Sequence, residues 1–231
     1  MKLIYNALRI IAIAYFIIIP ILFIIGKISL SEFISLVGVL PLAAIALFQE
    51  HFKRWFFAPK LEIELSHEEP YSIRTPMTDS AGKFVCYSYY FRFRVYNSGK
   101  SQARLCEAII EEFSEYDKNR WIKSYTFQPV NLIWSNDKSK DEFLNINPGA
   151  RWFCDIGSID QQNNIFWFYV RFRPNSQPKI LSEGLRANQK CKIKIALYSE
   201  NASKVTREFT IEWSGKWMNE SKDMFKEIVI R

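Results

Sequence analysis

The side chains that could carry chemistry in this sequence are few and widely spaced. The chain has two histidines, His51 and His67, and neither has a cysteine, histidine or carboxylate at metal-ligand spacing. The sequence contains no glycine-rich phosphate motif and no G-x-S-x-G nucleophile motif. We therefore expect no metal, no cofactor and no catalytic residue.

Four carboxylates could still provide a pair for acid–base catalysis. Glu107 and Glu111 have the sequence parity of a solvated strand face, which favours an ordinary surface role. The other two acidic residues considered are Glu112 and Asp155. A non-enzymatic protein is the expectation, and an enzyme of unknown class is kept as an alternative.

Aromatic residues are abundant and lie beside arginines in one long strand-like run. Tyrosines next to Arg92 and Arg94 could stack on a base or hold a phosphate, and Trp167 could line an exposed patch. Alternatively, the first group lies on a solvated sheet face, and the run Ile165–Val170 is a central strand covered on both sides. The candidate interaction surface comprises Tyr87, Tyr89, Tyr90, Arg92, Arg94, Trp167, Tyr169 and Trp217.

The elements that would position these residues read as β-strands. Along Phe84–Tyr96, apolar residues alternate with a face that includes Arg92 and Arg94, which we expect to be wet, and the turn formers Asn97–Ser101 follow. Short strands without intervening helices predict antiparallel sheets packed face to face. The other expected strands are Leu61–Leu65, Ala103–Phe113, Trp121–Phe127, Asn131–Trp134, Phe143–Ile146, Trp152–Ile156, Ile165–Phe172, Lys190–Ser199 and Val205–Trp213.

The end of the chain is expected to close the sandwich. Trp213 shares a strand face with Phe209 and Ile211, so its ring should be buried, and Gly215 should give the sharp turn that follows. Asn219 is the expected N-cap of a short helix that ends near Lys226.

Three segments carry a resemblance to known sandwiches. Phe93–Gly99, with Ala103 after it, resembles the strand–turn–strand of immunoglobulin-like adhesion and CARDB-type domains. The other two segments are similar to patterns in uncharacterised prokaryotic two-helix membrane proteins with such a domain. They are Asn147-Pro148-Gly149 with Asp155-Ile156-Gly157, and Trp213–Trp217 with Met224. The resemblance implies a fold for residues 61–230 but no activity and no site residues.

The four cysteines are expected to be free and buried. Cys86, Cys106, Cys154 and Cys191 each lie in an apolar run, and none forms a C-x-x-C pair. A free cysteine in such a run usually packs as a small hydrophobic residue.

The first 57 residues predict a transmembrane helical hairpin. Ile10–Gly26 and Phe33–Phe48 carry no charge, and a membrane span takes about 20 apolar residues. The expected helices cover residues 3–26 and 33–52, with a linker at 58–60 and a β-sandwich domain at 61–231. A cleaved signal peptide is the alternative for residues 1–26.

Charge sets the expected topology and excludes one class of partner. Basic residues flank the hairpin and only Lys27 lies in its loop, which predicts an inner-membrane protein with both termini cytoplasmic. The net charge is +7, but 25 basic and 22 acidic residues follow residue 60, so we expect no nucleic-acid binding.

Three functions fit these observations. The favoured one is a membrane-anchored, non-enzymatic β-sandwich that binds a protein partner or self-associates at the cytoplasmic face of the lipid bilayer. The second is a ligand-gated membrane effector of the antiphage type, whose β-domain senses a small molecule such as a cyclic nucleotide. The third is an enzyme.

Overall fold

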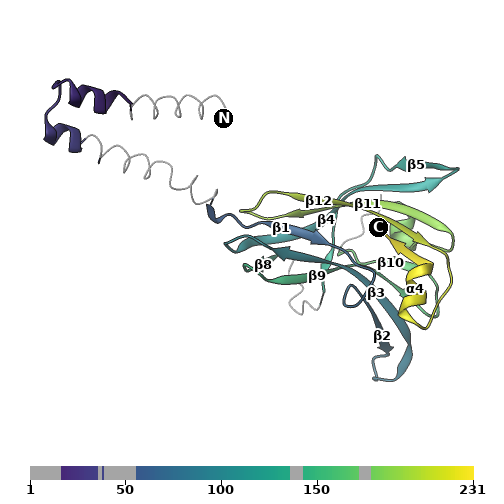
Figure 1. The fold of residues 1–231 in the computed structure, drawn as a ribbon. Helices are drawn as coiled ribbons and strands as arrows, with labels where there is room; N and C mark the ends of the chain where they lie inside the picture. Colours follow the sequence, from purple (N-terminus) through teal and green to yellow (C-terminus); the bar gives the residue numbers. More distant parts are fainter. Residues whose placement is uncertain (1–16, 36–37, 39–55, 136–142, 172–177) are drawn as a thin grey trace. The chain divides into compact units, whose positions relative to one another are not determined.

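The computed structural model describes residues 17–35, 38, 56–135, 143–171 and 178–231. The chain divides into two units, Met1–Phe56 and Phe57–Arg231. All the labelled strands and helices in Figure 1 belong to the second unit.

In the first unit, residues 17–24 and 30–35 are helical and a turn joins them. Ser29 and Glu32 form a reciprocal cap at the start of the second helix: the Ser29 backbone N–H donates to the Glu32 carboxylate at 2.7 Å. The Glu32 N–H in turn donates to the Ser29 hydroxyl at 3.3 Å. The sequence S-x-x-E therefore explains where this helix begins.

The prediction of a two-helix inner-membrane protein is wrong. Within the part of the chain that the structure describes, no helix has both the length and the apolar character that a membrane crossing requires. The prediction rested on the length of the uncharged runs Ile10–Gly26 and Phe33–Phe48. Apart from residue 38, the rest of the helices predicted at 3–26 and 33–52 lies outside the described residues.

The first sheet of the second unit is antiparallel. Its strands β1, β3, β9 and β10 are neighbours in that order, while β2 also pairs with β3 and β7 with β9. The bounds are β1 (Leu61–Glu64), β2 (Ser72–Thr78), β3 (Phe84–Asn97), β7 (Ile133–Trp134), β9 (Arg151–Asp160) and β10 (Phe166–Phe168). We call it the six-stranded sheet.

The second sheet runs in the order β13, β12, β11, β4, β5, and both β6 and β8 also pair with β4. We call it the seven-stranded sheet. Its strands are β4 (Ala103–Asp117), β5 (Arg120–Lys123), β6 (Val130–Asn131), β8 (Leu144–Ile146), β11 (Gln189–Tyr198), β12 (Val205–Trp213) and β13 (Ile228–Ile230). Two short helices are α3 (Lys179–Glu183) and α4 (Ser221–Glu227).

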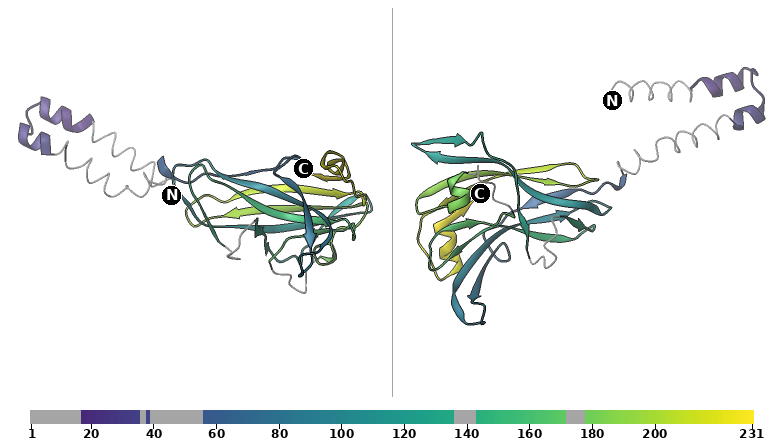
Figure 2. Two further views of the ribbon diagram at one scale, coloured as in Figure 1. Left: turned by 90° about the horizontal axis from the view of Figure 1, so that it is seen from below. Right: turned by 180° about the vertical axis from the view of Figure 1, so that it is seen from behind.

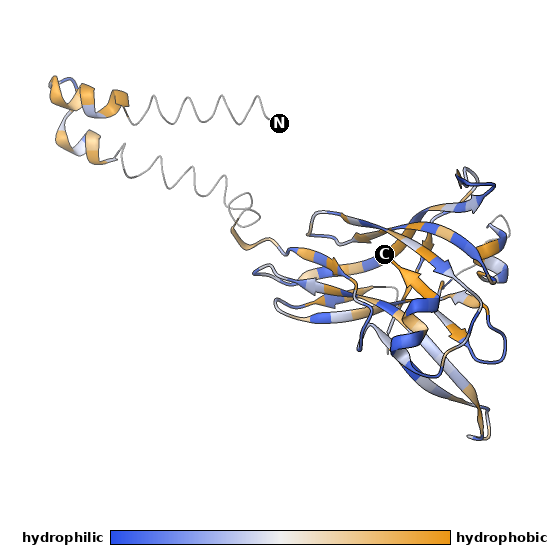
Figure 3. Cartoon of the chain, turned by 45° about the vertical axis from the view of Figure 1, so that its right-hand side comes forward, coloured by the Kyte–Doolittle hydropathy of each residue, from blue (hydrophilic) through white to orange (hydrophobic). Residues whose placement is uncertain are grey.

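The core lies between the two sheets because apolar side chains alternate along the strands. Tyr89, Phe91 and Phe93 of β3 are buried, and the Phe93 ring packs 6.1 Å from that of Phe209 in β12. Figure 2 shows the sheets as two layers, and Figure 3 shows the alternation of apolar and polar residues along the strands. The predicted β-sandwich is confirmed.

Asn97 explains the turn between β3 and β4. Its side-chain amide donates to the carbonyls of Ser101 and Ile146 at 2.8 and 2.9 Å. Its side-chain oxygen accepts from the backbone N–H of Gly99 at 3.0 Å. A Cβ on Gly99 would lie 2.3 Å from the Lys60 nitrogen, so only glycine fits here.

The closing tryptophan is placed as the sequence predicts. Trp213 is 1 % exposed, Phe209 and Ile211 are fully buried, and the Trp213 indole N–H donates to the Asn164 carbonyl at 2.9 Å. Gly215 has φ +90°, which supplies the expected turn. The four cysteines are free and buried, also as expected.

Other local predictions are wrong in part. β2 was not among the predicted strands. Pro76 interrupts its pattern, and an edge strand tolerates proline. The predicted short closing helix is present as α4, but its N-cap is Glu220 rather than Asn219, and Ile228 begins β13 directly after it. Asn219 has another role, since its backbone carbonyl accepts from the Tyr89 hydroxyl at 2.9 Å.

Candidate functional site

The outer face of the six-stranded sheet carries three arginines, each lying over an aromatic ring. The guanidinium carbon of Arg92 is 4.7 Å from the Phe153 ring centre, and that of Arg94 is 5.3 Å from the Tyr71 ring centre. A third stack of the same kind has a separation of 5.3 Å. We call this surface the arginine–aromatic face: Tyr71, Arg92, Arg94, Tyr96, Arg151 and Phe153.

The register of β3 against β9 brings these side chains together. Arg94 lies opposite Phe153 and Tyr96 opposite Arg151. Because successive side chains of a strand point to opposite faces, Arg92, Arg94 and Tyr96 share the outer face while Phe93 enters the core. The face is therefore formed by two strands that are far apart in the sequence.

Glu64 of β1 and the β1–β2 loop hold part of the face in place. The Arg94 Nε donates to the Glu64 carboxylate at 2.7 Å, and the Arg92 Nε donates to the Pro70 carbonyl at 2.6 Å. The Tyr71 ring packs 5.6 Å from the Phe153 ring, edge to face. Arg92 is consequently 9 % exposed, so the prediction that this face is wet is wrong at that position.

A half-buried carboxylate lies beside Arg92. Asp155 is opposite Arg92 in the β3–β9 register and accepts a 2.5 Å hydrogen bond from the Ser135 hydroxyl. Burial raises the pKa of Asp155, although Ser135 and Arg92 both act to lower it. Burial likewise lowers the pKa of Arg92, an effect that Asp155 opposes. A carboxylate whose pKa is raised by burial, beside a specific charged partner, often marks a functional surface.

Two tyrosines extend this face. The Tyr90 and Tyr169 rings are 5.6 Å apart, and burial together with the Tyr169 hydroxyl raises the pKa of Tyr90. Tyr90 therefore stays a neutral phenol and cannot serve as a base at ordinary pH. The register places Trp167 of β10 in one row with Ser158 and Tyr90, and Trp167 is half-buried.

The structure separates the predicted interaction residues into two groups. Tyr90, Arg92, Arg94, Trp167 and Tyr169 share the outer face described above. The other three predicted residues pack on the opposite side of β3: Tyr87, Tyr89 and Trp217. Tyr89 is fully buried with its ring 5.1 Å from that of Trp217, while the Arg74 guanidinium lies 3.8 Å from the centre of the Tyr87 ring. This second group helps to hold the C-terminal segment.

Several residues of the face were missed by the sequence analysis. Tyr71, Tyr96, Arg151, Phe153 and Ser135 contribute to it or to its buried end. Tyr96 ends the predicted strand with the parity of Arg92 and Arg94, which was an available signal. The others come from β9, from the residue after β7 and from the β1–β2 loop, whose positions depend on pairing between distant segments.

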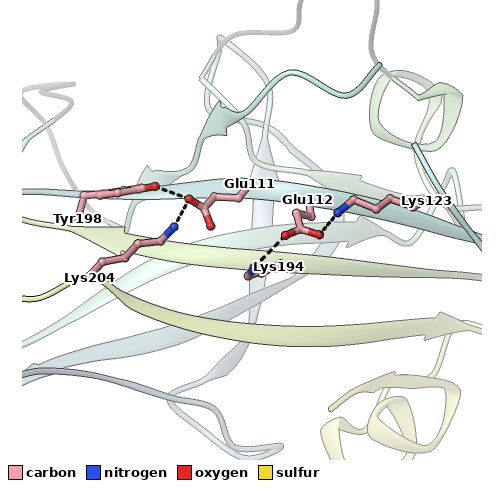
Figure 4. A network of polar contacts seen from close by, with 6 residues as sticks. All are labelled: Glu111, Glu112, Lys123, Lys194, Tyr198 and Lys204. Atoms are coloured by element: carbon pink, nitrogen blue, oxygen red, sulfur yellow. Dashed lines mark hydrogen bonds and ion pairs between the residues drawn. The ribbon is translucent and has the colours of Figure 1, made fainter. Parts of the chain in front are cut away.

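The outer face of the seven-stranded sheet is different, because its charges pair with each other (Figure 4). Glu112 of β4 contacts both Lys123 of β5 and Lys194 of β11, the latter at 2.8 Å. Those two lysines lower the pKa of Glu112 to about 2. We call this network the charge ladder; its other pairs are Lys190–Glu212, Lys192–Glu208 and Lys204–Glu111, the last joined by the Tyr198 hydroxyl.

The carboxylates considered for catalysis are not brought together. Glu111 and Glu112 are each paired with lysines in the charge ladder of the seven-stranded sheet, while Asp155 lies on the six-stranded sheet. Glu107 accepts a 3.2 Å hydrogen bond from the Asn131 side-chain amide. Burial opposes a low pKa at Glu111, but Lys204 and Tyr198 outweigh it and lower the value. In the described part of the chain, no group of three or more histidine, cysteine, aspartate or glutamate residues could hold a metal ion.

A small cavity lies between the β1–β2 loop and the C-terminal segment. Its volume is about 10 Å³, and its lining includes His67, Ser72, Arg92 and Phe225. That is room for roughly one water molecule, whereas pockets for small organic ligands measure on the order of 300–1,000 Å³.

Comparisons with known proteins add little to this description. Neither a scan against protein-family models nor a search of curated proteins found a match. A crystal structure of the protein assigned as ApaA from Bordetella pertussis is 12 % identical, covers 67 % of this chain and 94 % of its own, and has a TM-score of 0.29. An X-ray structure of a structural-genomics target is 12 % identical, covers 71 % of this chain and 92 % of its own, and has a TM-score of 0.27. Of the resemblance noted in the sequence, the two facing antiparallel sheets confirm the β-sandwich.

Proposed function

We propose that this chain is a non-enzymatic protein-binding module whose contact surface is the arginine–aromatic face. The observation that carries the proposal is the stacking of Arg92, Arg94 and Arg151 on three rings of one sheet face. Arg151 is exposed, so a guanidinium held over a ring at that position can still donate its N–H groups to a partner's carboxylate or carbonyl.

The composition of the two outer faces supports this choice. Protein interfaces are enriched in arginine, tyrosine, phenylalanine and tryptophan and depleted in lysine and glutamate relative to the rest of the surface. Residues that dominate binding energy have the same bias. The arginine–aromatic face fits that description, and the charge ladder on the other sheet fits the description of ordinary solvated surface.

Accessible residues are present at the rim of the face. Arg151 is exposed, and Tyr96 and Phe153 are half-buried. The half-buried rings give a partner apolar area to cover, and the more deeply buried Arg92 and Tyr71 beneath them keep the face rigid. A rigid contact surface loses less conformational entropy on binding.

An open face of this kind suits a macromolecule better than a small ligand. The cavity of about 10 Å³ beside Arg92 is far too small for a cyclic nucleotide, so the ligand-sensing alternative gains no support there.

The finer assignment of the sandwich as immunoglobulin-like is also part of this proposal. Two facing antiparallel sheets and the Asn97–Gly99 turn support it.

Charge reversal at the rim tests the proposal. The affinity-tagged full chain is purified from its native cells after mild cross-linking, as wild type, as Arg151→Glu and as Lys192→Glu. We expect a discrete partner protein with the wild type and the Lys192→Glu control, and at least a tenfold lower yield with Arg151→Glu. Equal recovery with all three chains, at equal thermal stability, would place binding elsewhere.

A further inference from the structure

The β4–β5 hairpin ends the seven-stranded sheet with an unpaired strand. Figure 1 shows it extending from the sandwich. In the described residues, β5 pairs only with β4, and all four of its residues are exposed. Lys118 and Asn119 have φ of 46° and 64°, as the two central residues of a tight hairpin turn require.

The hydrogen-bond pattern fixes which backbone groups of β5 are free. The Ser124 N–H donates to the Phe113 carbonyl at 3.0 Å, and the register pairs Glu115 with Ile122 and Asp117 with Arg120. Hydrogen-bonded and non-hydrogen-bonded pairs alternate in an antiparallel ladder. The backbone N–H and C=O groups of Trp121 and Lys123 therefore point away from β4, toward the open edge.

Lys123, the lysine that could discourage pairing at this edge, does not extend from the edge. A lysine on a short edge strand usually discourages pairing with another chain. Here the Lys123 ammonium is held on the outer face of the sheet by Glu112. Apolar and aromatic surface accompanies the open edge: Trp121, Ile122 and Tyr125 are 39 %, 40 % and 92 % exposed.

The charge around the edge is basic. Lys118 and Arg120 have no ion pair within the described part of the chain, and Glu112 is shared between two lysines. Glu212 is likewise shared, between Lys190 and Arg231. Pairing with a second copy of this chain would bring these basic groups together, whereas an acidic strand would complement them.

We propose that the free edge of β5 binds an extended acidic segment of a partner protein by strand addition. The backbone of the added strand pairs with Trp121 and Lys123, its apolar residues cover the Trp121 and Ile122 side chains, and its acidic residues lie near Lys118 and Arg120. This site is separate from the arginine–aromatic face and does not depend on it. Main-chain pairing would provide affinity, and the basic surroundings would provide selectivity.

A synthetic peptide that alternates glutamate and valine over eight residues is the probe, added to the purified full chain. Binding is followed by fluorescence anisotropy and by amide hydrogen exchange. We expect saturable binding, new protection of the Trp121 and Lys123 amides, and at least tenfold weaker binding of a lysine–valine peptide. Equal binding of both peptides, or no protection at β5, would overturn the proposal. A dimer whose β5 amides are already protected would also overturn it.

A matched pair of variants isolates the backbone contribution. Lys123→Pro removes an N–H that points away from β4, and Lys123→Ala removes the same side chain but keeps that N–H. We expect Lys123→Pro to bind at least tenfold more weakly than Lys123→Ala, and equal affinities would contradict strand addition. If Lys123→Pro does not fold, a peptide N-methylated at alternate residues replaces it, with the same loss expected. Arg151→Glu should leave peptide binding unchanged, which separates this result from the proposed function.

Discussion

The two outer faces of this sandwich are built from strands of the same kind, yet they treat charge in different ways. On the seven-stranded sheet, lysines pair with glutamates, and the paired side chains are between 16 % and 59 % exposed. On the six-stranded sheet, arginines lie over aromatic rings, and Arg92 and Asp155 have given up much of their hydration. The charges of the seven-stranded face are neutralised by neighbouring side chains. On the six-stranded face, burial of Arg92 and Asp155 costs solvation free energy.

The magnitudes of these interactions explain why the difference matters. An exposed ion pair contributes about 0–1 kcal/mol, so the charge ladder keeps the surface soluble but adds little stability. A cation–π contact contributes about 0.5–2 kcal/mol, and desolvating a charge costs several kcal/mol unless a partner compensates. Stability should therefore depend strongly on a few residues of the arginine–aromatic face and weakly on any single residue of the ladder.

The largest contrast should appear between Arg92→Ala and Lys192→Ala. Loss of Arg92 removes its contacts with Phe153 and Pro70 and leaves Asp155 without its cation, so we expect a loss of about 3 kcal/mol in unfolding free energy. Lys192→Ala breaks one exposed ion pair and should cost at most about 0.5 kcal/mol. Urea denaturation of both full-length variants gives the comparison. Similar losses would mean that the two faces do not differ in the way we describe.

A smaller effect should appear in the pH dependence of Asp155→Asn. Because burial raises the folded-state pKa of Asp155 above its usual value of 3.8, the protonated carboxyl is favoured in the folded chain. Its contribution to stability is fully present below pH 3.8 and is lost as the pH rises through the raised value. The melting temperature of Asp155→Asn minus that of the wild type should thus increase from pH 4 to pH 7. A difference that stays constant or decreases would contradict the burial argument.

The smallest effect concerns Glu112 in the charge ladder. Lys123 and Lys194 hold the pKa of Glu112 at about 2, so its contribution is present above the usual value of 4.5 and is lost as the pH falls through about 2. Because the side chain is 37 % exposed, Glu112→Gln should cost less than about 1 kcal/mol. A titration of the side-chain carboxyl by NMR checks this, and 1 M salt should raise the midpoint. A midpoint near 4.5 at low salt would show that the ladder does not form.

The contrast between the two faces was only partly visible in the sequence. Period-two alternation is a local property, so it separated Arg92 and Arg94 from Phe91 and Phe93 correctly. The alternation could not show that Phe153 of β9 would lie under Arg92, because that pairing joins distant segments and includes a register shift next to Arg92. Burial of Arg92 followed from that same pairing and from the β1–β2 loop.

Local sequence patterns were an incomplete guide to the structure at the two ends of the chain. The uncharged runs near the N-terminus predicted spanning helices, whereas no helix within the described residues is long and apolar enough to cross a membrane. The residue pattern after Gly215 correctly predicted one short helix, α4, but it could not show that the Asn219 carbonyl would accept from the Tyr89 hydroxyl or that Ile228 would join β12 as part of β13. At the C-terminal end, these details depend on tertiary contacts, which local composition does not show.

Site-specific photo-cross-linking compares the two faces most directly. A photoreactive phenylalanine analogue replaces either Tyr96 on the arginine–aromatic face or Thr210 on the face of the charge ladder, in the full chain within its native cells. Binding through the arginine–aromatic face predicts a discrete cross-linked protein from position 96 and none from position 210. Cross-linking of the same partner from position 210 but not from position 96 would contradict it.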